Sequence, residues 1–486
     1  MTTTTPTPTT APVGRPWAAV WSMVIGFFMI LVDTTIVSIA NPTIQRELQT
    51  DEAGVIWVTS AYLLAYAVPL LIAGRLGDRF GPRTLYLLGL AIFTVSSLWC
   101  GFSDSLGMLI AARAVQGLGA ALMTPQTMAI ITRVFSPDRR GPAMALWGAT
   151  SGVALLVGPL LGGVLVDGLG WEWIFFVNVP VGVIGFVLAA IFVPKLATHA
   201  HRFDVLGVVL SAVGMFLVVF GLQESNSDWF GDWWIVSLVA GVAVLAGFVA
   251  WQRVNRGEPL LPLRLFGDRN FSVGNAVITI VGFSITAMTL PMAYYTQAAR
   301  GLTPTQSALL LVPLAVVTLV LSPIVGRFVG RIDPRALTVP GLVLFAVSLF
   351  VYSAMAAAEV EVAWLLVPMT IMGIGQAGVW APISNATVRN LDHRDAGAGS
   401  GVYNSMRQVG GVVGAAVMAA VISAAIAAQF PGVDTSTFEP GGEIPQPVVD
   451  GLSAAFSQAL LVPAVAVLVG AGVALLFAKP RALAAR

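Results

Sequence analysis

The chain contains stretches of about twenty residues without a charged side chain, and these constrain its fold more than any other feature. Phe271–Pro291 and Leu337–Ala358 are two of them. A helix needs about 20 predominantly apolar residues to cross the hydrocarbon core of a bilayer. Because lipid offers no hydrogen-bond partners, the backbone of such a stretch must satisfy its own polar groups, as an α-helix does. The sequence therefore predicts an all-α polytopic membrane protein.

The composition is that of a membrane protein rather than of a water-soluble one. Of the 486 residues, 57% are hydrophobic and 10% are charged, whereas soluble domains carry about 25% charged residues. The chain has one cysteine, Cys100, within an apolar run, and its three histidines lie in polar connections. These residues predict neither a disulfide framework nor a metal site.

Sequence motifs of enzymes and of ATP-driven pumps are missing. The sequence has no Gly-x4-Gly-Lys-Ser/Thr loop, so ATP hydrolysis by this chain is not supported. It also has no serine nucleophile elbow and no cluster of metal ligands. We therefore expect no enzymatic activity, no cofactor and no nucleic-acid partner.

Fourteen apolar stretches are long enough to cross a membrane. They are residues 17–40, 55–74, 84–102, 108–132, 142–166, 173–193, 205–222, 233–252, 271–291, 306–329, 337–357, 362–388, 401–428 and 455–478. Residues 1–16 are rich in Thr and Pro and are expected to form a disordered tail. Residues 479–486 form a second tail.

The positions of the basic residues orient these spans. If both termini are cytoplasmic, 21 of the 25 Lys and Arg residues fall on the cytoplasmic side. Arg46 and Arg300 fall outside, and Arg113 and Arg407 fall within spans. This is the distribution that the positive-inside rule describes, and a missed span would reverse it downstream. We expect a multi-pass protein of the cell (inner) membrane with both termini in the cytoplasm.

An internal repeat divides the chain into two halves. Residues 74–83 read Gly-Arg-Leu-Gly-Asp-Arg-Phe-Gly-Pro-Arg, and residues 326–335 read Gly-Arg-Phe-Val-Gly-Arg-Ile-Asp-Pro-Arg. Eight spans separate the two copies, whereas a plain duplication of six would leave six. The sequence predicts two six-helix halves, residues 17–193 and 271–478, with two inserted helices at 205–252. Chance recurrence of Gly/Arg turns is the alternative explanation.

Several motifs together resemble the major facilitator superfamily, and specifically its fourteen-helix drug:proton antiporters. The stretch Leu31–Pro42 is similar to a first-helix motif of that group, and Arg113–Ala121 resembles a fourth-helix motif linked to proton coupling. The first copy of the repeat resembles the superfamily's gating motif. Trp171–Pro180 is similar to the start of the sixth helix, with Glu172 where Arg is common.

The resemblance implies roles for two groups of residues. The gating residues would be Gly74, Asp78, Arg79, Gly81, Arg83, Arg327 and Arg331. The family commonly has an acidic residue where Gly330 stands, so the second turn departs from the pattern. The antiporter motif of the fifth span would comprise Gly158, Pro159, Gly162 and Gly163.

The function that the resemblance implies is proton-coupled export of hydrophobic or cationic drugs and related amphipathic compounds by alternating access. Its partners would be a small amphipathic substrate, protons and the bilayer; the sequence does not predict an oligomeric state. Export of an endogenous lipid or metabolite would give a similar sequence. A membrane sensor that does not transport, and a channel, are further alternatives, although no large soluble signalling domain is present and the two-half repeat suits alternating access.

Asp33 and Arg113 are the predicted proton-coupling pair. Asp33 lies about seven residues from the outer end of the first span, and Arg113 about five from the outer end of the fourth, so their depths agree within a few Å. Intramembrane carboxylates are costly and mark functional sites. A static salt bridge, or an Asp33 satisfied by the hydroxyls of Thr34 or Thr35, is the structural alternative.

Asp78 is expected in a short cytoplasmic turn before the third span. There its carboxylate could cap a helix N-terminus or pair with Arg79, Arg83 or Arg139. In the family that the chain resembles, such contacts hold the cytoplasmic gate in one state. A solvated loop charge is the alternative.

Polar and aromatic residues of several spans could line a substrate cavity. The candidates are Gln116, Tyr294, Gln297, Gln376, Trp380, Asn385 and Asn404. The polar groups could instead bridge helices, and aromatic residues near span ends often belong to the interfacial belt. Arg407, near the cytoplasmic start of its span, could extend to the lipid headgroups.

Overall fold

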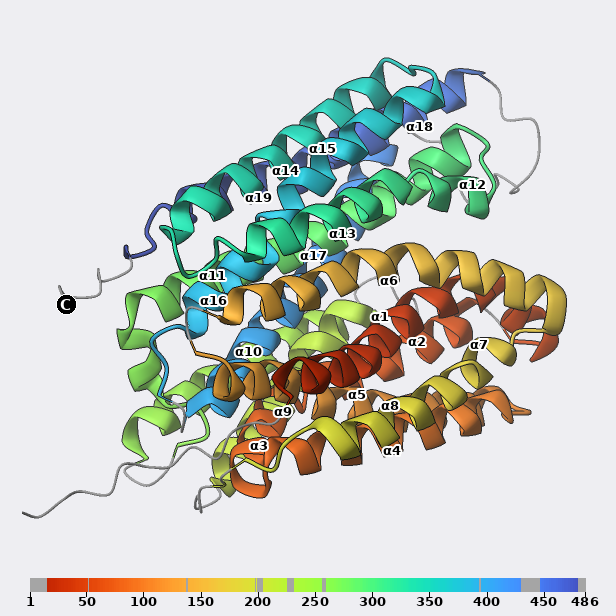
Figure 1. Ribbon diagram of the computed structural model, residues 1–486. Coiled ribbons are helices and arrows are strands. Elements are labelled where there is room, and N and C mark those ends of the chain that lie inside the picture. The colour runs from red at the N-terminus through yellow and green to blue at the C-terminus, as the bar shows by residue number, and fades with distance from the viewer. Residues whose placement is uncertain are drawn as a thin grey trace, which may run out of the picture.

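The computed structural model describes residues 15–50, 52–136, 139–196, 198, 204–224, 231–255, 259–392, 395–429 and 446–479. Most of both predicted tails therefore lies outside the described residues. The described residues form helices and turns and contain no β-strand. Figure 1 shows long helices running roughly side by side in one bundle.

The first half of the chain forms eight helices. They are α1 (Pro16–Glu47), α2 (Glu52–Ala67), α3 (Leu70–Phe80), α4 (Pro82–Gly101), α5 (Leu106–Val134), α6 (Arg140–Leu169), α7 (Trp173–Phe176) and α8 (Asn178–Phe192). The inserted pair follows as α9 (Val205–Gln223) and α10 (Trp233–Val254).

The second half is divided into more helical segments, several of them short. It comprises η2 (Leu263–Gly267), α11 (Arg269–Tyr294), the π-helix η3 (Tyr295–Ala299), α12 (Pro304–Leu309), α13 (Val312–Gly326), α14 (Pro334–Ala357), η4 (Val362–Leu365), α15 (Leu366–Ala377), α16 (Trp380–Val388), α17 (Ala396–Gln429), α18 (Gln446–Ala459) and α19 (Leu461–Ala474).

Within the described residues, twelve helical stretches are long and apolar enough to cross a membrane, or thirteen if α2 and α3 form one bent span. Helix α6 is a further helix of 30 residues, which corresponds to about 45 Å. These counts are compatible with the fourteen predicted spans. Large apolar side chains on α10, such as Val236, Val239 and Val242, are exposed, as expected of a helix that faces lipid.

The span predicted at 55–74 extends to Phe80 and bends by 45° between Ala67 and Leu70. Pro69 lies at the bend, and proline lacks the N–H that would continue the helical hydrogen bonds. The bend starts a new helix, α3, so the second part of this span carries most of the first gating motif. The helix therefore continues six residues beyond the predicted end of this span.

The two halves meet at the end of the bundle where α3 and α13 end and α17 begins, called here the Asp78 end. A Cβ atom on Gly74 of α3 would lie 2.4 Å from the carbonyl oxygen of Gly397 in α17. A Cβ atom on Gly141 of α6 would lie 2.3 Å from the carbonyl oxygen of Gly326 in α13. Backbones this close need glycine, because any larger residue would collide with a main chain.

The inserted pair packs on the line where the halves adjoin. Val219 and Phe220 of α9 belong to one apolar cluster with Leu64 of α2 and Val412 of α17. The segment after α10 is fixed to the first half, because the Arg75 guanidinium donates to the carbonyl oxygens of Pro259 and Leu260. The inserted helices are therefore attached to both halves.

Candidate functional site

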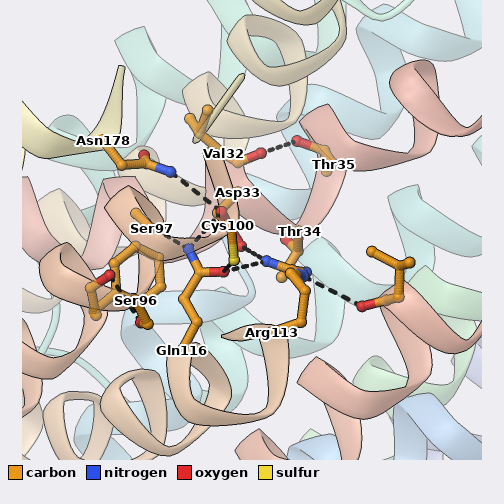
Figure 2. Close-up of polar contacts among 12 residues, drawn as sticks. Val32, Asp33, Thr34, Thr35, Ser96, Ser97, Cys100, Arg113, Gln116 and Asn178 are labelled. Atoms are coloured by element: carbon orange, nitrogen blue, oxygen red, sulfur yellow. Dashed lines mark hydrogen bonds and ion pairs between the residues drawn. The ribbon is translucent and has the colours of Figure 1, made fainter. Parts of the chain in front are cut away.

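A fully buried ion pair lies in the middle of the first half. Asp33 lies within the apolar stretch of α1, and Arg113 lies on α5. A guanidinium nitrogen of Arg113 is 2.6 Å from Oδ2 of Asp33, and both side chains are 0% exposed. Depth along the two helices predicts this proximity, and the structure places the two residues in direct contact (Figure 2).

Two amides complete the shell around the Asp33 carboxylate. The side-chain nitrogen of Gln116 donates to Oδ1 at 3.0 Å, and that of Asn178 donates to the same oxygen at 3.2 Å. Together with Arg113, this gives the carboxylate three donors, which matches an ionised group that only accepts hydrogen bonds. The four residues come from α1, α5 and α8, so the site joins three helices (Figure 2).

Gln116 also connects the pair to α4. Its nitrogen donates to the Ser97 hydroxyl at 2.6 Å, and its oxygen accepts from Arg113 at 2.6 Å. The Cys100 thiol lies 3.7 Å from the same oxygen. Gln116 is therefore part of the ion-pair network and is 0% exposed.

Aromatic rings enclose the Arg113 guanidinium. Its carbon lies 4.1 Å from the centroid of the Tyr62 ring and 5.7 Å from that of Phe175. The Nε atom donates to the carbonyl oxygen of Val58 at 3.2 Å. Cation–π contacts gain strength when water is excluded, so α2 and α7 hold the arginine in addition to α1.

The alternative in which threonine hydroxyls satisfy Asp33 has no support in the structure. The hydroxyl of Thr34 donates to the carbonyl oxygen of Leu31, and that of Thr35 donates to Val32. Both are local bonds to the preceding turn of α1. Side chains of other helices satisfy the carboxylate, so its protonation would change the hydrogen bonds of those helices.

Asp78 lies in the last turn of α3 and is 0% exposed, rather than in an exposed turn. Its ion-pair partner is Arg133 of α5 instead of Arg79, Arg83 or Arg139. On a helix, neighbouring residues point about 100° apart, so Asp78 faces the protein while Arg79 is exposed.

The Asp78 carboxylate also caps a helix of the other half. Its two oxygens accept from the backbone N–H groups of Gly397, at 3.1 Å, and Ala398, at 3.0 Å. Both belong to the first turn of α17, where a carboxylate satisfies unpaired N–H groups and the positive end of the helix dipole. Asp78 therefore connects the two halves directly.

The other residues of the first gating motif have separate contacts. Gly81 has a φ of +92°, a backbone conformation that suits glycine, and it ends α3. The Arg83 guanidinium donates to the carbonyl oxygen of Ala190 in α8. Arg79 lies over the ring of Phe80, 5.3 Å from its centroid.

The second gating turn differs from the first. Arg327 and Arg331 are exposed, and Gly330 has a φ of +82° at the position of Asp78. Asp333 caps its own helix α14 by accepting from the N–H of Arg335 at 3.0 Å. In the described residues, the capping contact between the halves thus comes from the first copy.

The predicted antiporter motif lies on α6, which packs between α1 of its own half and α13 of the other (Figure 1). A Cβ atom on Gly158 would lie 1.8 Å from the Thr35 hydroxyl. Gly162 is buried, and a Cβ atom on Gly163 would lie 3.8 Å from the hydroxyl of Thr305. Pro159 falls within α6. The helix therefore approaches α1 two residues from Asp33.

The predicted cavity residues do not form one cluster. Tyr294 is 51% exposed and stacks on Phe456, and Gln297 is exposed. Asn385 lines a small cavity with Gly330 and Arg389 below the second gating turn.

Three further candidates are buried in the second half. Gln376 and Trp380 lie on α15 and α16, and the Trp380 ring lies edge-on to Trp147 of α6, with 6.3 Å between centroids. Asn404 is 0% exposed on α17. Trp380 of the second half therefore contacts the first half, and Asp78 of the first half contacts the second.

Three residues of these networks were not predicted from the sequence: Tyr62, Arg133 and Asn178. Arg407 extends to α2, where its guanidinium lies 3.5 Å from the Tyr66 hydroxyl, rather than to the headgroups. For Asn178 the signal is a buried amide in an otherwise apolar span, which by itself does not indicate a partner.

Comparison with known proteins identifies the family. The family model described as Major Facilitator Superfamily matches residues 23–415. The chain belongs to the major facilitator superfamily. As a member of that superfamily it is a transporter rather than an enzyme.

Relatives of this major facilitator protein include exporters. It is 50% identical over 94% of its length to an uncharacterised MFS-type transporter of Mycobacterium tuberculosis, covering 80% of that protein. It is 35% identical over 84% of its length to the tetracenomycin C resistance and export protein of Streptomyces glaucescens, covering 76% of it. The solved proton:xylose symporter XylE has the same fold, with a TM-score of 0.63 at 12% identity over 94% of this chain and 95% of that one.

Proposed function

We propose that this transporter exports small amphipathic compounds in exchange for protons, and that Asp33 is the residue that binds the proton. The observation that carries the proposal is the buried network of Asp33 with Arg113, Gln116 and Asn178. An ionisable group inside a membrane protein is a functional-site candidate, because the charge is costly there.

Proton binding at Asp33 would change the contacts of three helices. A protonated carboxyl carries one O–H donor and no charge, so it no longer balances Arg113. The side-chain N–H of Gln116 or of Asn178 would then face the new O–H donor of Asp33. The Arg113 guanidinium would need another partner. Because these groups lie on α1, α5 and α8, the arrangement of the first half depends on the proton.

The gate is the contact between Asp78 and α17. In the predicted topology the Asp78 end is cytoplasmic, so the structure corresponds to a state closed towards the cytoplasm. Alternating access requires this contact to break when the transporter turns inward. Arg133 connects the two sites, because it lies on the same helix α5 as Arg113.

The outward direction of transport rests on the relatives. One is named as a tetracenomycin C resistance and export protein, and another as multidrug resistance protein Stp of Mycobacterium tuberculosis. The close approach of α6 to α1 at Gly158 is consistent with the antiporter motif that the sequence resembles.

Everted membrane vesicles test this function. Vesicles that contain the transporter and are energised by respiration should accumulate amphipathic dyes, and a protonophore should abolish the accumulation. Vesicles without the protein are the control. Accumulation that survives the protonophore would contradict proton coupling, and equal uptake by the control vesicles would contradict transport.

A further inference from the structure

Arg407 is a second arginine inside the membrane region, and it lies where the halves adjoin. It follows Ala396, the first residue of α17, by 11 positions, or about 16 Å of helix. Its guanidinium reaches the Tyr66 hydroxyl of α2 at 3.5 Å. That hydroxyl also lies 3.1 Å from the hydroxyl of Thr124 on α5. Arg407 therefore faces the first half from the second.

No carboxylate of the described residues lies within ion-pair distance of Arg407. The other arginine within a predicted span, Arg113, is paired with Asp33. The Nε atom of Arg407 is buried and has no hydrogen-bond partner. The positive charge between the halves is thus not neutralised by the described part of the chain.

Further unsatisfied polar atoms lie on the same stretch of α17. Asn404 and Tyr403 precede Arg407 by three and four positions, so the three share one face of the helix. The Asn404 side chain is 0% exposed; its nitrogen donates to the carbonyl oxygen of Ser400, and its oxygen has no partner. The Tyr403 hydroxyl is also buried without a partner. A buried polar group without a partner is costly, so each such group needs an explanation, and a bound ligand is one.

We propose that Arg407, Asn404 and Tyr66 form a substrate subsite that selects aromatic anions, compounds with an ionised phenol or carboxylate. The proposal rests on the export function above and narrows its substrate class. Arginine binds a carboxylate or phenolate oxygen with parallel N–H donors. The free Asn404 oxygen accepts from a hydroxyl of the ligand, and the Tyr66 ring supplies an aromatic wall.

The charges explain why cations are disfavoured at this subsite. Asp33, which could have attracted a cation, is enclosed and neutralised by Arg113. Thr124, beside the subsite, follows Arg113 by 11 positions on α5, so the two sites are about 16 Å apart along the helix. A substrate at Arg407 therefore meets an uncompensated positive charge, which favours anions over the cationic drugs expected from the sequence.

Two dyes with the same xanthene ring and opposite charge test this. Binding of fluorescein, an anion near neutral pH, and of the cation rhodamine 6G is measured by fluorescence anisotropy on the purified full chain in nanodiscs. We expect fluorescein to bind at least about tenfold more tightly, the scale of one charge-assisted hydrogen bond. Arg407→Gln should weaken fluorescein binding by about tenfold without weakening rhodamine 6G binding. Arg407→Lys keeps the charge, so it should still bind fluorescein more tightly than rhodamine 6G.

Arg253→Gln is the matched control, because it removes an exposed arginine at the end of α10. This substitution should change the affinity for neither dye. If Arg407→Gln lowers the melting temperature, two other variants decide. Arg407→Lys should keep the preference for fluorescein over rhodamine 6G, and Asn404→Leu should weaken fluorescein binding. Equal or tighter binding of rhodamine 6G, an unchanged fluorescein affinity in Arg407→Gln, or binding of neither dye would overturn the subsite. The vesicle assay tests the export function separately, because it measures accumulation that depends on the proton gradient and not the affinity for a dye.

Discussion

Asp78 accepts a hydrogen bond from the backbone N–H of Gly397 at 3.1 Å, although 319 positions separate the two residues in the chain. One belongs to α3 of the first half and the other to α17 of the second. The carboxylate also pairs with Arg133, so one buried group joins a salt bridge to a helix cap. One buried charge therefore joins the two halves by capping the N-terminus of α17.

Asp78→Asn should loosen this gate. The amide keeps the shape but loses the charge that favours both Arg133 and the helix dipole, and hydrogen bonds to charged groups contribute about 1.5–3 kcal/mol. The population open at the Asp78 end should rise about tenfold. Double electron–electron resonance measures the size of this open population. Spin labels are placed at the exposed positions Phe80 and Arg331 in a Cys100→Ser background. An unchanged distance distribution would refute the cap as a gate contact.

Gly158→Ala should destabilise the first half. The added Cβ would lie 1.8 Å from the Thr35 hydroxyl, so α6 must move away from α1 or Thr35 must change rotamer. Overpacking of this kind costs about 1–3 kcal/mol. Thermal melting should show the loss, and Thr35→Ala should recover part of it. Gly168→Ala is the control, because nothing lies within 4 Å of its added Cβ; equal effects of the two substitutions would contradict the argument.

Asp204 should make the attachment of the inserted helices pH-dependent. Burial alone would raise the pKa of its carboxyl, but donors from Trp251, Gln252 and the backbone of Gly207 and Leu260 lower it below the ordinary value. A lowered pKa contributes stability above about pH 4 that is lost as the pH falls through the folded-state value. Wild type should therefore melt at a higher temperature than Asp204→Asn at neutral pH, and the difference should vanish in strong acid. A difference that persists below about pH 2 would show that the charge is not its cause.

Much of the architecture follows from the sequence, because lipid leaves an apolar run few alternatives to a helix. Span positions and the pairing of Asp33 with Arg113 come from run length and depth along the helix. The partners of Asp78 could not be predicted in this way. They depend on the bend near Pro69, which places Asp78 on a buried face, and on Gly397, whose proximity results from packing between the halves.

Arg407 illustrates the same limit. Its place within a span marks it as unusual, but the sequence does not distinguish a side chain that extends to headgroups from one that crosses to α2. That distinction depends on how α17 is rotated, which is set by glycines that pack against α11. A Cβ atom on Gly410 would lie 2.0 Å from the carbonyl oxygen of Thr279, so the close packing of α17 on α11 fixes this rotation.

The most direct test of the account measures proton-driven transport by Asp33→Asn in proteoliposomes. Dye exchange without a gradient reports alternation, and dye accumulation under an imposed pH gradient reports coupling. The account predicts that Asp33→Asn retains exchange and loses accumulation, whereas Asp104→Asn, at an exposed position between α4 and α5, keeps both. Accumulation by Asp33→Asn at the wild-type level, with equal amounts of protein, would contradict the assignment of Asp33 as the proton-binding residue.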